Sequence, residues 1–164
     1  MAKSCWLEVA QTTSSQKDQL FSFVEYLELI QVSAKGFSFH VIEDVAQTEK
    51  FKRLMGVLWM TASMRRNVEL FGKFQCFDMM KRGINKLLWP YVALSLYDEF
   101  GGLCVGCEGI VCGERLDMYV ALSNFVHEQC PLLPKHAVKI VSADKFFRKS
   151  DIQAHESNLS SYGI

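Results

Sequence analysis

The stretch FQCFDMM, residues 74–80, places a single carboxylate inside an apolar run. Apolar runs of this length, bounded by turn residues, are typical of strands. Aspartate is rarely buried unless it is paired or binds a metal, so the role of Asp78 needs an explanation. A second stretch, VKIVSADKFF at residues 138–147, has the same form and ends its apolar part on Asp144. The two aspartates are therefore the first candidates for a site.

The chain after the first stretch predicts a regular order of elements. Residues 91–98 and 103–111 have the pattern of strands separated by a tight turn, EFGG, and residues 137–144 that of another strand. Between them, apolar residues at helical spacing from Leu116 to Val126 predict a helix. Three strands joined by short turns form an antiparallel meander, and the helix lets the last strand run parallel to the first. We therefore predict an α/β fold with a mixed sheet in the order β-β-β-α-β.

The first 72 residues predict an α+β segment that precedes this core. A helix is expected from Ser14 to about Ser33, followed by a hairpin of strands at 37–44 and 51–61. A short helix at 63–72 follows, with Ser63 as its cap and Gly72 as its end. The predicted organisation is an N-terminal segment at 1–72, a core at 73–152 and a frayed tail at 153–164, with a further helix after Asp144.

Composition excludes some classes of protein. The 164 residues are enough for one domain, and the net charge of zero is not that of a strongly basic DNA-binding module. No apolar run approaches the roughly 18 residues of a membrane span. The N-terminus lacks the apolar segment of a secretory signal, so we expect an intracellular protein without a membrane partner. Glycine-rich nucleotide-binding motifs are absent, so no small-molecule cofactor is expected.

The six cysteines are interpreted as reduced, buried thiols. The segment CVGCEGIVC contains one C-x-x-C, but a zinc site would need a second pair of ligands, which the sequence does not supply. Residues three apart on a regular strand point to opposite faces. Cys104 and Cys107 are therefore not expected to converge.

The predicted topology gives the two aspartates a shared chemistry. On neighbouring parallel strands, about 4.8 Å apart, Asp78 and Asp144 lie near the ends where open sheets bind ligands. Such a pair could hold one or two Mg²⁺ ions, which take a few carboxylates and keep waters or phosphates. Each aspartate also has a simpler interpretation as a turn residue, and Asp144 as the cap of a following helix. Both interpretations stay open at this point.

From residue 25 to residue 152 the chain resembles the catalytic core of Mutator-like element (MULE) transposases, which are DDE-type enzymes with a ribonuclease H-like fold. The segments that carry the resemblance are CFDMMKRGIN, WPYVALSLYDEFGG, LCVGCEGIVCGE, LDMYVALSNFV and VKIVSADKFF. The resemblance implies a partial ribonuclease H-like fold in which Asp78 and Asp144 are the first two catalytic acids and the metal ligands. It also implies Mg²⁺ or Mn²⁺ as cofactor, the DNA of transposon ends as partner, and a nuclear location.

The sequence departs from the family in its third acid, usually a glutamate far downstream. Glu156 lies too close to Asp144 to match it. Asn85 matches a loop asparagine without a firm catalytic role, and Glu108 and Glu114 match acidic positions that are not metal ligands. We therefore expect a truncated or inactive transposase core. The alternative is a domesticated, non-catalytic module that binds DNA or protein. A third interpretation is an unrelated α/β protein whose aspartates are structural.

Four cations follow the two aspartates: Lys81, Arg82, Lys145 and Arg148. If the site exists they would surround it, and we expect them to contact DNA phosphates. Other basic pairs, such as Arg65-Arg66, are expected to be solvated surface. A sheet without its last strand would expose an edge and a face, so we also expect self-association into a homo-oligomer.

Overall fold

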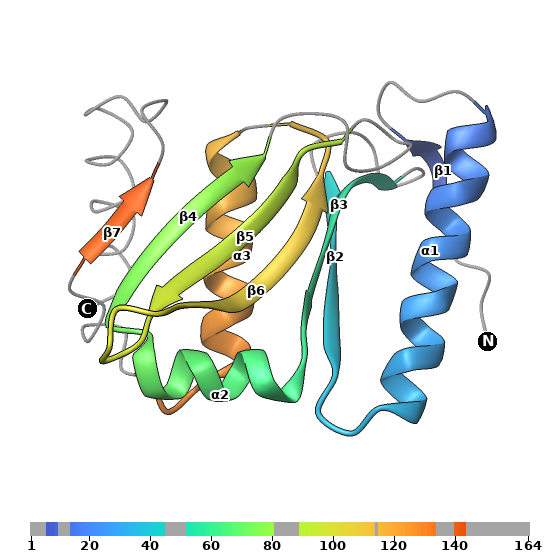
Figure 1. Ribbon diagram of the computed structural model, residues 1–164. Helices are drawn as coiled ribbons and strands as arrows, with labels where there is room; N and C mark the ends of the chain where they lie inside the picture. Colours follow the sequence, from blue (N-terminus) through green and yellow to red (C-terminus); the bar gives the residue numbers. More distant parts are fainter. Residues whose placement is uncertain are drawn as a thin grey trace.

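The computed structural model describes residues 6–9, 14–44, 52–80, 89–113, 115–133 and 140–143. These residues form a mixed α/β fold (Figure 1), which confirms the predicted class. The elements in chain order are β1 (Trp6–Val9), α1 (Ser14–Ser33), β2 (Ser38–Asp44), β3 (Lys52–Met60), α2 (Ala62–Phe71), β4 (Phe74–Met80), β5 (Tyr91–Tyr97), β6 (Leu103–Val111), α3 (Leu116–Gln129) and β7 (Ile140–Ala143).

The seven strands of the described residues belong to one sheet, in the order β1-β3-β6-β5-β4-β7, with β2 also paired to β3. Strands β4, β5 and β6 form the predicted antiparallel meander. Strand β7 pairs with β4 in parallel, as predicted, after the crossover through α3. The predicted hairpin of β2 and β3 is also confirmed. Its attachment to β6, and the parallel strand β1 beside β3, were not predicted from the sequence.

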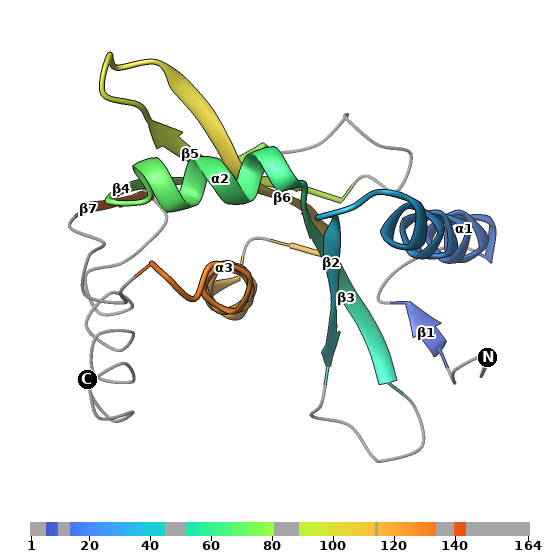
Figure 2. The same cartoon turned by 90° about the horizontal axis from the view of Figure 1, so that it is seen from below.

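The helices lie on different sides of this sheet. Helix α3 covers one face behind β4, β5 and β6, and α2 lies across the lower end of the sheet against β6 (Figure 1). Seen from below, β2 and β3 stand between α3 on one side and α1 on the other (Figure 2). The sheet is therefore covered by α3 on one face, while α1 covers only the part near β3.

Two apolar clusters correspond to these two helices. The larger cluster lies beneath α3, where Met118, Leu122 and Phe125 pack on the buried side chains of the sheet. The smaller cluster lies beneath α1 and includes Leu27 and Trp89. Burying apolar side chains from both helices is the main stabilising contribution to this arrangement.

Helix α2 begins one residue before the predicted segment, and its cap is Thr61 rather than Ser63. Thr61 has an extended backbone, and its hydroxyl accepts a hydrogen bond from the Met64 N–H at 3.2 Å. Arg65 also differs from the expected solvated surface residue. It is half-buried and donates to Ser38 at 3.3 Å and to Gln129 at 3.0 Å, which ties α2 to β2 and α3.

A β-bulge in β6 reverses one expectation about the cysteines. The register between β5 and β6 shifts at Gly106, so Cys104 is opposite Leu96 while Cys107 is opposite Leu94. Both leucines point toward α3, and the two thiols therefore lie on the same face of the sheet. The expectation that they point to opposite faces is wrong, because it assumed an unbroken strand. A Cβ at Gly106 would come within 2.7 Å of the Val68 side chain, so a larger residue is poorly accommodated there.

Candidate functional site

Asp78 lies on the face of β4 that points away from α3. Its neighbours Phe77 and Met79 are buried, whereas the Asp78 side chain is exposed. The reason is the two-residue period of a strand, which sends alternate side chains to opposite faces. Within the described part of the chain, no hydrogen bond or ion pair involves the Asp78 carboxylate. Its place in an apolar run therefore requires no buried partner.

We call this side of the sheet the open face, defined by Asp78 and Met80 on β4, Tyr91 and Ala93 on β5, and Glu108 on β6. Helix α3 lies on the opposite face, and Met80 leaves 51% of its surface exposed. The exposed sheet face expected from the sequence is thus present on β4 and β5. Self-association through it stays a prediction.

The parallel pairing of β4 with β7 is described as far as Phe77, which is the partner of Ala143. In the sequence, Asp78 follows Phe77 and Asp144 follows Ala143. The remaining predicted positions lie outside the described residues: Asp144, Lys81, Arg82, Lys145 and Arg148, together with Asn85, Glu114 and Glu156.

A row of paired residues crosses the open face from Asp78. Asp78 is opposite Ala93, Ala93 is opposite Glu108, and Glu108 is opposite Trp59 on β3. Directly paired residues share a face, so the two carboxylates point to the same side of the sheet. Two strand spacings separate their Cα atoms, which corresponds to about 10 Å. Ala93 contributes only a methyl group between them.

Glu108 is held by two side chains that are distant in the sequence. Trp59 Nε1–H donates to its Oε2 at 3.0 Å, and the Tyr91 hydroxyl donates to its Oε1. Burial raises the pKa of Tyr91 above its usual value, and the hydrogen bond and charge of Glu108 raise it further. Tyr91 therefore keeps its proton and remains a donor. Because both oxygens already accept hydrogen bonds, Glu108 is less suited than Asp78 to bind a metal.

The residues around Glu108 were not identified as a group from the sequence. No sequence motif connects Trp59 or Tyr91 with Glu108. The alternation of side chains along each strand could have indicated which face of the sheet each of these residues occupies. The order of the strands in the sheet, which brings β3 beside β6, carried no sequence signal.

Comparisons with family models, with curated proteins and with solved structures find no match to this chain. Among the described residues, no three His, Cys, Asp or Glu side chains are close enough together to hold a metal ion. None of the helices in the described part is long and apolar enough to cross a membrane. The open face thus offers one exposed carboxylate, Asp78, at the strand pair β4–β7.

Proposed function

We propose that this chain carries the ribonuclease H-like scaffold of a Mutator-like DDE transposase core, and that Asp78 and Asp144 bind Mg²⁺ or Mn²⁺ for cleavage of DNA. The observation that carries the proposal is the parallel, in-register pairing of β4 with β7. In the sequence, Asp78 follows Phe77 and Asp144 follows Ala143, and Phe77 and Ala143 are the last residue pair of this register. A metal site shared by neighbouring strands requires this arrangement.

The order of the strands supports the same scaffold. A meander of three antiparallel strands, a helical crossover, and a fourth strand parallel to the first give the order β6-β5-β4-β7. This is the β-β-β-α-β arrangement that the resemblance implies. The additional β2–β3 hairpin extends the sheet beyond β6 and leaves this order unchanged.

The chemistry of Asp78 fits a divalent ion. Its carboxylate is exposed and has no partner among the described residues, and hard oxygen ligands of this kind suit Mg²⁺ and Mn²⁺. A bound ion in such sites activates water and stabilises the attacking and leaving oxygens of phosphoryl transfer. The part of Asp78 would be to hold the ion on the open face, where α3 does not block the approach of a duplex.

The proposal is tested by titrating Mg²⁺ and Mn²⁺ into the protein by calorimetry. Wild type should bind, and Asp78→Asn and Asp144→Asn should each lose most of the heat. Asp117→Asn is the matched control, because Asp117 is an exposed aspartate on α3, across the sheet from Asp78. Equal binding by wild type and by the Asp78→Asn/Asp144→Asn double variant would exclude this metal site.

A non-catalytic, domesticated module is the second candidate function. It is favoured by the neutral net charge and by the single unpaired carboxylate among the described residues of the open face. Nicking of supercoiled plasmid in Mn²⁺ separates the two candidates. Nicking that is lost in Asp78→Asn supports the catalytic core, whereas metal-independent binding of labelled duplex without nicking supports the module.

A further inference from the structure

Helix α1 stands at one end of the molecule (Figure 1) and is apolar on two sides. Its inner side packs on the smaller apolar cluster, where Leu27 is buried. Its outer side carries a second set of apolar side chains, Tyr26, Leu29 and Val32, which leave 57%, 70% and 89% of their surface exposed. Apolar residues on both sides of a helix are typical of a helix that is covered on both sides.

We call Tyr26, Leu29 and Val32 the outer row. Residues three apart on a helix are neighbours, with Cβ atoms about 5–6 Å apart, so Leu29 lies between the other two. The row extends over about 9 Å of the helix axis. The three exposed side chains therefore form one continuous apolar surface rather than scattered contacts with solvent.

The charges beside the outer row are negative. Glu25 and Glu28 are exposed, and they lie one turn before Leu29 and Val32 respectively. Within the described part of the chain, neither carboxylate takes part in an ion pair or a hydrogen bond. Residues 21–33 of the helix contain no lysine or arginine. Both negative charges are therefore available to a partner.

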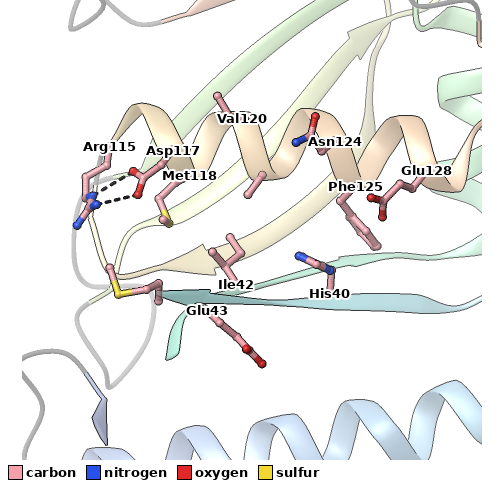
Figure 3. A pocket seen from close by; sticks show the side chains of 12 residues that line it. His40, Ile42, Glu43, Arg115, Asp117, Met118, Val120, Asn124, Phe125 and Glu128 are labelled. Carbon is pink, nitrogen blue, oxygen red and sulfur yellow. Dashed lines mark hydrogen bonds and ion pairs between the residues drawn. The ribbon is translucent and has the colours of Figure 1, made fainter. Parts of the chain in front are cut away.

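The groove beside α3 lacks such free groups. This groove has a volume of about 650 Å³ and lies between α3 and β2 (Figure 3), and its lining residues Ile42 and Met118 are buried. At its rim, Asp117 is ion-paired with Arg115 at 2.8 Å. The outer row combines exposed apolar side chains with unpaired carboxylates, so it is better suited to bind a partner.

We propose that the outer row binds an amphipathic helix of a partner protein that carries lysine or arginine beside its apolar residues. The apolar side chains of this helix would cover the outer row, and its cations would pair with Glu25 and Glu28. A ridge of side chains three residues apart fits the groove between the side-chain rows of a second helix. The inference is independent of the proposed metal site, because α1 lies at the far end of the sheet from β4.

The two carboxylates argue against other occupants. Two copies of α1 related by a two-fold axis at Leu29 would bring the two Glu28 carboxylates close together, and like charges facing each other across an interface are unfavourable. The same charges disfavour the phosphates of DNA and the surface of an anionic membrane. A cationic helix is therefore the occupant that these charges indicate.

The test uses fluorescence anisotropy with a fluorescein-labelled peptide of leucine and lysine, in which the leucines follow a helical spacing. A peptide with glutamate in place of lysine is the control for charge. A peptide of the same composition, scrambled so that no apolar side forms, is the control for pattern. Wild-type protein should bind only the first peptide. Failure to bind it, or equal binding of either control peptide, would overturn the proposal.

Variants locate the binding site on the protein. Leu29→Gln should weaken binding about tenfold, because it removes the central apolar side chain while glutamine keeps a high helix propensity. Leu70→Gln changes an exposed leucine on α2 and should leave the affinity unchanged. Glu28→Lys should weaken binding about fivefold, since it replaces an attractive charge by a repulsive one. Glu99→Lys makes the same charge change in the exposed β5–β6 turn and should have no effect. Circular dichroism melts establish that each variant is folded.

Two other results would contradict the proposal. Equal weakening by Leu29→Gln and Leu70→Gln would mean that the peptide does not bind at the outer row. A dimer of the wild-type protein in sedimentation velocity that is lost in Leu29→Gln would assign the outer row to a second copy of this chain instead.

Discussion

Replacing Glu108 by alanine should reduce the free energy of unfolding by about 2–4 kcal/mol. The Glu108 carboxylate is half-buried and accepts hydrogen bonds from Trp59 Nε1–H and from the Tyr91 hydroxyl. The substitution leaves both donors without this acceptor. A buried donor left unpaired costs about 1–3 kcal/mol, and partial exposure of these groups places each near the lower half of that range.

Glu108→Gln distinguishes lost hydrogen bonds from lost charge. The amide oxygen can accept from Trp59, and the amide nitrogen can donate to the Tyr91 oxygen after its hydroxyl rotates. Both contacts then persist without their charge assistance, so the loss should be about 1 kcal/mol. Tyr91→Phe should fall between the two variants, because it removes one donor and leaves the Trp59 contact in place.

The assay is urea-induced unfolding followed by circular dichroism, with the free energy extrapolated to water. Glu99→Ala, an exposed glutamate in the β5–β6 turn, is the control and should change stability by less than about 0.5 kcal/mol. The reasoning is refuted if Glu108→Ala is as stable as this control. A Glu108→Gln variant as unstable as Glu108→Ala would equally show that the charge, and not the hydrogen bonds, matters.

Two further predictions concern stability. Gly109→Ala should cost roughly 2 kcal/mol or more in the same urea assay, because its Cβ would lie 2.5 Å from Leu58 Cδ2 and 2.7 Å from the Val57 carbonyl oxygen. Gly113→Ala, where a Cβ meets no atom within 4 Å, is the control and should be neutral or slightly stabilising. Burial raises the pKa of the Cys130 thiol from 9.0 to about 11, so the folded protein holds a proton that the unfolded chain releases. The contribution of this thiol to the free energy of unfolding is therefore complete below about pH 9 and is lost as the pH rises toward 11. Melting temperatures across this range should fall less steeply in Cys130→Ala, and identical slopes would contradict the assignment.

The element order follows from local pattern, and most of it was predictable. Strands β4, β5 and β6 show apolar runs ended by turn residues, and α3 shows apolar residues at helical spacing. The meander and the parallel fourth strand follow from connection lengths, because short turns allow only antiparallel neighbours. Strand β1 was missed, since its four residues, Trp6–Val9, are too few to establish a period.

The candidate site was predictable only in part. The parallel pairing of β4 with β7 confirms the prediction that the last strand lies beside the strand that carries Asp78. The exposure of Asp78 follows from alternation with Phe77 and Met79, once their burial on the α3 side is known. The groove of about 650 Å³ beside α3 is lined by residues of β2, β3 and α3, so no single segment of sequence indicates it.

The sequence alone determined where most of the strands and helices form and which strands of the meander are neighbours, because these properties depend on nearby residues. Only the tertiary structure decided that β3 joins β6, which gives Glu108 the donor Trp59, 49 residues away in the sequence. It also decided which side chains of β6 share a face of the sheet, because the bulge at Gly106 places Cys104 and Cys107 on one face. Both outcomes depend on how strands pair across the sheet. The pairing of two strands leaves no periodic signal in the sequence of either strand.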